Sequence, residues 1–134
     1  MPARIPQRKR RGSPTNRAMV TGITLWGGTT ACLVFALGLA LYPAWLLGGT
    51  LATFAMFGFD KLQAKRDPGR SGRGRVPERA LLLLSLIGGA FGGLAGMIIF
   101  RHKIRTTAFV IAVPLFVLLH VGVAWWLLLG QYGN

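Results

Sequence analysis

Residues 80–100 read ALLLLSLIGGAFGGLAGMIIF, and the path of this stretch determines the topology of the chain. It contains no Lys, Arg, Asp or Glu, and it has the roughly 20 residues that a helix needs to cross the hydrocarbon of a bilayer. Gly88, Gly92 and Gly96 recur in it at i, i+4 and i+8. Such spacing lets two helix backbones approach closely and is typical of packed membrane helices.

A second track of small residues, formed by Ser85, Gly89 and Gly93, repeats this spacing. We predict that both tracks serve helix packing. The same glycines also fit a turn, which would make residues 81–100 a re-entrant hairpin whose irregular backbone must be buried in protein. We favour a full span, because the length suits a crossing and the small-residue spacing is regular.

Outside this stretch, charge is confined to three blocks, Met1–Arg17, Asp60–Arg79 and Arg101–Arg105. The charge-free run Ala18–Phe59 is long enough for two crossings, and Thr106–Leu129 is long enough for one. The sequence therefore predicts an all-α, polytopic membrane protein with about four hydrophobic helices, the third of which either spans the membrane or re-enters it.

The first apolar run has Tyr42-Pro43 near its middle, where a hairpin turn would fall. We expect one helix over Met19–Leu41 and a second that starts at Ala44 and extends beyond the membrane to Arg66.

The chain divides into a tail and a membrane domain. Residues 1–18 are basic and poor in apolar side chains, so we expect a disordered cytoplasmic tail. Residues 19–134 form the predicted membrane domain.

The chain has 16 Lys and Arg against 3 Asp and Glu, a formal net charge of +13. Because these cations flank apolar runs, they indicate positive-inside topology: a multi-pass inner (cytoplasmic) membrane protein with its N-terminus in the cytoplasm, and anionic lipid headgroups as partners. If residues 81–100 span the membrane, three cations lie opposite the other thirteen; if they re-enter, all sixteen share one side.

Two residues within the apolar runs could carry chemistry. Cys32 is the single cysteine, so it can form no internal disulfide, and we expect it to pack. His120 is a functional candidate because it is ionisable within a membrane segment. We favour a packing role, with the imidazole bonded to a neighbouring backbone group or a Thr hydroxyl.

The polar residues follow the order Asp60-Lys61, Arg75-Val76-Pro77-Glu78 and Arg101-His102-Lys103, with the glycine pairs before the last group. In this order, residues 57–114 resemble domain of unknown function 1294, a family of small bacterial membrane proteins. The family-like region extends over about 46–128. The resemblance implies a helical membrane protein and no established activity.

The topology of residues 81–100 decides whether the polar signature can form one site. If they span, Asp60 and Glu78 lie opposite Arg101 and Lys103; if they re-enter, two carboxylates and a histidine converge and could do acid–base work or bind a metal. We expect Asp60 to pair with Lys61, Lys65 or a loop arginine, and Arg101 and Lys103 to reach headgroups. The polar signature comprises Asp60, Lys61, Arg75, Glu78, Arg101, His102 and Lys103.

The function that we favour is a structural or interaction protein whose basic cytoplasmic face contacts anionic lipid or a protein partner, and which can form a homo-oligomer. One alternative is a membrane enzyme acting on a lipid-linked phosphate, with Glu78 or His102 as the catalytic candidate. Another is a membrane tether for nucleic acid that uses Arg8–Arg11 and Arg70–Arg75. We expect no cofactor and no metal, and we lean against an enzyme, because the sequence has no nucleophile elbow or phosphate loop.

Overall fold

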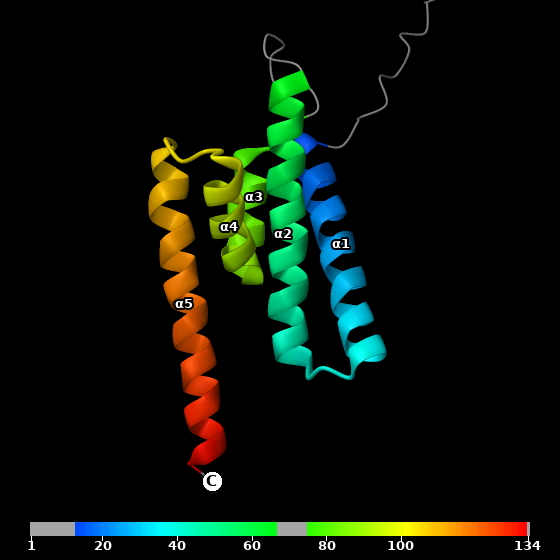
Figure 1. The fold of residues 1–134 in the computed structure, drawn as a ribbon, viewed down its shortest axis with the longest axis vertical. Helices are drawn as coiled ribbons and strands as arrows, with labels where there is room; N and C mark the ends of the chain where they lie inside the picture. The colour runs from blue at the N-terminus through cyan, green and yellow to red at the C-terminus, as the bar shows by residue number, and fades with distance from the viewer. Residues whose placement is uncertain (1–12, 67–74, 134) are drawn as a thin grey trace, which may run out of the picture.

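The computed structural model describes residues 13–66 and 75–133. Within these ranges the chain has no β-strand, and four segments are long and apolar enough to cross a membrane (Figure 1). The prediction of an all-α chain with four hydrophobic segments is confirmed. The helices are α1 (Pro14–Leu37), α2 (Leu41–Arg66), α3 (Glu78–Leu84), the π-helical segment η1 (Ser85–Gly89), α4 (Ala90–Phe100) and α5 (Thr107–Tyr132).

Parts of two predicted segments lie outside the described residues. These are residues 1–12 of the basic tail, with Arg8–Arg11, and residues 67–74 of the basic turn. α1 begins at Pro14, before the predicted start at Met19, because Ser13 caps the helix: its Oγ accepts a hydrogen bond from the Asn16 backbone N–H at 3.2 Å.

α1 and α2 form an antiparallel pair joined by a short turn (Figure 1). Gly38 ends α1 with a φ of 64°, so the predicted turn at Tyr42-Pro43 is placed too late. Pro43 instead lies in the first turn of α2, where the backbone N–H that proline lacks would have no helical partner. α2 continues to Arg66, as predicted.

The third segment, Glu78–Phe100, is a hairpin, and the full span that we favoured is wrong. It bends at Gly88, whose φ of 155° and ψ of −1° are not helical. Its two ends meet the same side chain: Asp60 accepts a hydrogen bond from the backbone N–H of Val76 at 3.1 Å and lies 2.6 Å from His102. The start of α3 and the end of α4 therefore lie at the same end of the bundle, which we call the polar end (Figure 1).

Side chains of α1 and α2 cover the bend. A Cβ added at Gly88 would lie 2.8 Å from the ring of Trp26 and 2.9 Å from Nε1 of Trp45, so only glycine fits there. The Trp45 indole N–H donates to the carbonyl of Ile87 at 3.4 Å, and Gly49 of α2 allows the Gly88 carbonyl to approach. The irregular backbone at Gly88 is thus buried by helices of the same chain, and a second copy of the protein is not needed to cover it.

The predicted packing glycines lie against α2. Because the chain bends at Gly88, however, neither of the two small-residue tracks lies on a single helix. A Cβ at Gly92 would collide with the backbone of Thr50, and one at Gly96 would lie 2.8 Å from Cβ of Phe57. Gly89 lies against the Thr53 side chain. Gly93 and Ser85 face each other across the bend, since a Cβ at Gly93 would lie 2.6 Å from Ser85 Oγ.

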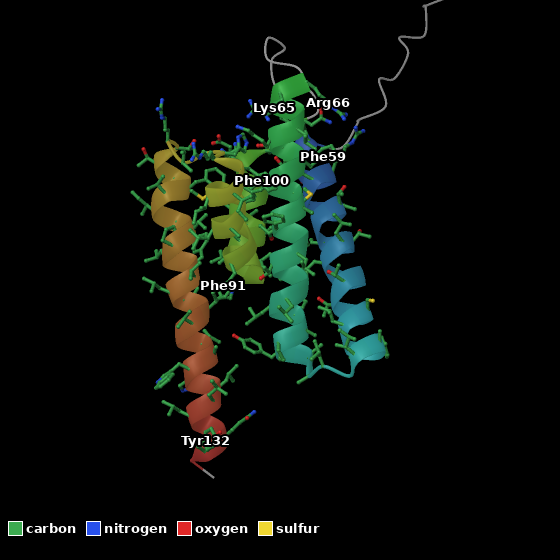
Figure 2. All side chains as sticks on the ribbon, viewed as in Figure 1. Phe59, Lys65, Arg66, Phe91, Phe100 and Tyr132 are labelled. Carbon is green, nitrogen blue, oxygen red and sulfur yellow. The ribbon has the colours of Figure 1, made fainter. Side chains whose placement is uncertain are left out.

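α5 packs on the hairpin through the half nearest the polar end. Phe109 and Val113 are fully buried. The Phe109 ring packs edge to face on the ring of Phe57, with 5.8 Å between the ring centroids. Farther along, Trp125 and Trp126 are exposed, and Tyr132 lies at the opposite end from Lys65 and Arg66 (Figure 2). His120 Nδ1 lies 2.7 Å from the Phe116 carbonyl oxygen, which is the backbone contact we predicted.

Candidate functional site

Asp60 is the centre of a polar network at the polar end. Its carboxylate is fully buried on α2, where an unpaired charge would be strongly destabilising. Oδ1 accepts from the Val76 N–H at 3.1 Å and lies 3.7 Å from Nε of Arg75. Oδ2 lies 2.6 Å from Nε2 of His102 and 3.7 Å from Nζ of Lys103. Oδ1 thus contacts the segment before the hairpin, and Oδ2 contacts the segment after it.

The turn between α4 and α5 aims His102 and Lys103 toward α2. Arg101 and Lys103 on either side of the histidine have left-handed backbones, with φ of 46° and 59°. A non-glycine residue in this region costs about 1–3 kcal/mol, so the surrounding contacts must hold the turn in place. The His102 N–H bonds the Met97 carbonyl at 3.3 Å, and the Thr106 N–H bonds that of Lys103 at 3.1 Å.

Lys103 joins the network instead of reaching outward, so the expectation that it would extend to lipid headgroups is wrong. Its Nζ donates to Oε1 of Glu78 at 2.9 Å and lies 5.1 Å from the centre of the Phe109 ring. Its side chain is only 7% exposed, whereas that of Glu78 is 56% exposed. Glu78 therefore connects the buried network to the surface.

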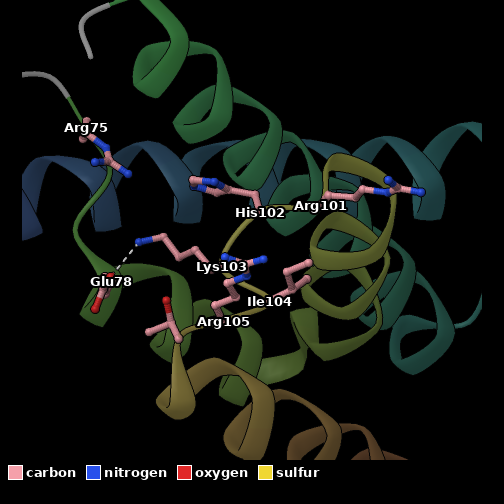
Figure 3. Close-up of a pocket in the computed structure, with 8 residues that line it drawn as sticks. Arg75, Glu78, Arg101, His102, Lys103, Ile104 and Arg105 are labelled. Carbon is pink, nitrogen blue, oxygen red and sulfur yellow. Dashed lines mark hydrogen bonds and ion pairs between the residues drawn. The ribbon is translucent and has the colours of Figure 1, made fainter. Parts of the chain in front are cut away.

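A pocket of about 440 Å³ opens beside this network (Figure 3). Four cations and one carboxylate line it, so its lining is positive on balance. In Figure 3 Lys103 reaches toward Glu78, while Arg101 extends to the other side. The lining residues are Arg75, Glu78, Arg101, His102, Lys103, Ile104, Arg105 and Thr106.

The structure brings together most of the predicted polar signature. Five of its residues form the network or contact it directly, and Arg101 lines the pocket. Within the described residues neither Lys61 nor Lys65 forms an ion pair with Asp60, so of the three partners we expected for Asp60, only the loop arginine is found. The five are Asp60, Arg75, Glu78, His102 and Lys103.

Sequence reasoning missed three contributors to the site. Arg105 lines the pocket, and its place in the third charge block was the available signal. Phe109 supports the Lys103 ammonium, and the backbone of Val76 supplies a hydrogen bond that no side-chain pattern reveals. Within the described residues, no group of three or more His, Cys, Asp or Glu could hold a metal ion.

The fold and the site define a helical protein with four membrane-length segments, the third of which is a hairpin closed by a buried polar network. Residues 50–109 match the sequence model of a family described as a protein of unknown function, DUF1294, so the resemblance is confirmed over this stretch. The match runs from α2 through the hairpin to Phe109 and includes all five network residues. No curated protein and no solved structure matches the chain.

Proposed function

We propose that this chain is an inner-membrane protein whose polar end faces the cytoplasm and binds the anionic headgroup of a lipid. Along α2, about 26 Å separates Phe59 from Tyr42, at ~1.5 Å per residue. Along α5, about 27 Å separates Thr107 from Trp125 on the same scale. Both spans approach the ~30 Å of a bilayer core, with aromatic side chains at the far boundary. The pocket then lies at the headgroup level.

The orientation follows from where the cations lie. The described Lys and Arg residues occur in the first turns of α1 and α3, the last turns of α2 and the segments that flank the hairpin. These segments meet at the polar end (Figure 1). A full span of residues 81–100 would place the cations of residues 101–105 on the opposite side from the others, and the hairpin avoids this separation. A cytoplasmic polar end then agrees with the positive-inside rule.

The observation that carries the proposal is the excess of cations around the pocket. Lys103 is engaged by Glu78, and Arg75 makes only a long contact with Asp60, at 3.7 Å. Arg105 has no ion pair within the described part of the chain. Guanidinium groups bind phosphate oxygens through paired N–H donors, so Arg75 and Arg105 suit a phosphate headgroup.

Lipid binding can be tested by native mass spectrometry of the purified full chain with added phosphatidylglycerol or phosphatidylcholine. We expect the chain to retain the anionic lipid preferentially. The double variant Arg75→Gln, Arg105→Gln should lose this preference, whereas Arg66→Gln, which removes an exposed arginine outside the pocket, should keep it. Equal retention of both lipids by the unaltered chain would contradict the proposal.

A further inference from the structure

The environment of His102 fixes which ring nitrogen can react. Nε2 lies 2.6 Å from the buried Oδ2 of Asp60, a carboxylate oxygen that accepts a hydrogen bond from it. The proton of a neutral imidazole is therefore held on Nε2, and Nδ1 keeps its lone pair. Within the described residues the His102 side chain has a hydrogen bond only at Nε2, so Nδ1 has no partner there. His102 also lines the pocket. This is the arrangement of an oriented base beside a binding site for anions.

We propose that the pocket hydrolyses the phosphomonoester headgroup of a membrane lipid, with His102 as the base. This inference rests on the proposed headgroup binding and adds a reaction to it. Asp60 acts as a positioning residue, because it contacts the imidazole and not the substrate. Lys103, which lines the same pocket as His102, supplies the proton for the leaving group.

The reaction balances with water as the only co-reactant. His102 Nδ1 takes a proton from a water molecule as the water oxygen forms a bond to phosphorus. The bond between phosphorus and the lipid oxygen breaks, and this oxygen takes a proton from Lys103. The products are inorganic phosphate and the lipid alcohol, and the proton on His102 returns to Lys103 through solvent. Arg75 and Arg105 hold the phosphoryl oxygens on which charge concentrates.

Two features of the pocket select this substrate class. A phosphomonoester carries nearly two negative charges at neutral pH, which suits a lining of four cations and one carboxylate better than the single charge of a phosphodiester. The lining also includes Ile104, which is 48% exposed, and the neighbouring Ile98 and Ile99 of α4 are exposed as well. Acyl chains can lie against these apolar side chains while the headgroup enters the pocket.

The test uses the full chain in detergent micelles with phosphatidate, and it measures both inorganic phosphate release and lipid retention. We expect the unaltered chain and Arg66→Gln to release phosphate. His102→Gln should retain phosphatidate but release phosphate at least about 100-fold more slowly, the usual contribution of a general base. Asp60→Asn should lower kcat more than it raises KM and should shift the pH profile of kcat, which a purely structural role would not do.

The outcomes separate the two proposals. Retention of phosphatidate without phosphate release by the unaltered chain would overturn the hydrolysis and leave headgroup binding intact, whereas failure to retain any anionic lipid would overturn both. Undiminished release by His102→Gln would overturn the role of the histidine. Glycerol 3-phosphate supplies the same phosphomonoester without acyl chains, so its equally fast hydrolysis would overturn the assignment to a lipid.

Discussion

His102 and Asp60, which are 42 residues apart in the sequence, place Nε2 and Oδ2 2.6 Å apart in a buried contact. Asp60 belongs to α2, and His102 follows the hairpin directly, so this contact closes the hairpin. The same contact orients the imidazole beside the pocket. Closure of the hairpin and construction of the site are therefore one structural feature, and changes to Asp60 should affect both.

The first prediction concerns topology. Because the hairpin returns to the polar end, a cysteine at Ile104 should be labelled from the same side of the membrane as a cysteine at Arg66. A cysteine at Gln131 should be labelled from the other side. The measurement is the reaction with a membrane-impermeant maleimide, in a Cys32→Ser background that removes the native thiol. Labelling of positions 104 and 66 from opposite sides would contradict the hairpin.

The second prediction concerns the close packing of α4 on α2. Gly92→Ala should lower the free energy of unfolding by about 1–3 kcal/mol, because the added methyl group meets the backbone of Thr50, which cannot easily move. Gly122→Ala is the matched control, since no atom lies within 4 Å of its Cβ position. It should be neutral or stabilising, because alanine favours helix over glycine. Unfolding in mixed micelles measures both variants, and equal effects would argue against the packing.

The sequence was sufficient to predict the helices and most of the residues of the site. Charge-free runs such as Ala18–Phe59 predicted helices long and apolar enough to cross a membrane, and the structure has them. The polar signature was recognisable by residue type and order. Three of its members contact Asp60, and Glu78 joins the network through Lys103.

The hairpin could not be predicted, because the deciding contacts are distant in sequence. Gly88 suits both a packed helix and a turn, and its spacing from Gly92 favoured the helix. What selects the turn is cover from α1 and α2, in particular Trp26, Gly49 and Trp45. Lys103 was misjudged for a similar reason, since its partner Glu78 comes within reach only after the chain has folded back.

The third prediction compares the two carboxylates of the network. Asp60→Asn should lower the free energy of unfolding by about 3–5 kcal/mol, because it removes the charge that balances buried and partly buried cations. Glu78→Gln makes the same carboxyl-to-amide change at a side chain that is 56% exposed, and it should cost about 1 kcal/mol or less. Lys103 then still lies near Asp60.

Unfolding of both carboxylate variants in the same mixed micelles provides the comparison. A smaller loss of stability for Asp60→Asn than for Glu78→Gln would show that Asp60 does not hold the hairpin closed. Because His102 pairs with Asp60, the effects of Asp60→Asn and His102→Gln should also be non-additive in the double variant.

The fourth prediction separates backbone strain from crowding at the bend of the hairpin. Gly38 and Gly88 both have positive φ, but no atom lies within 4 Å of a Cβ built on Gly38, whereas Trp26 and Trp45 crowd that position on Gly88. Gly38→Ala should therefore cost only the strain of a left-handed alanine, about 1–2 kcal/mol. Gly88→Ala should cost more, because its φ of 155° suits alanine less than the left-handed region does and because the tryptophans must also move, and the hairpin should open. A cysteine at Ile104 in the Gly88→Ala background, probed with the impermeant maleimide, measures this opening as faster labelling than in the Gly38→Ala background. Equal stability losses and equal labelling rates would mean that the tryptophans do not clamp the bend.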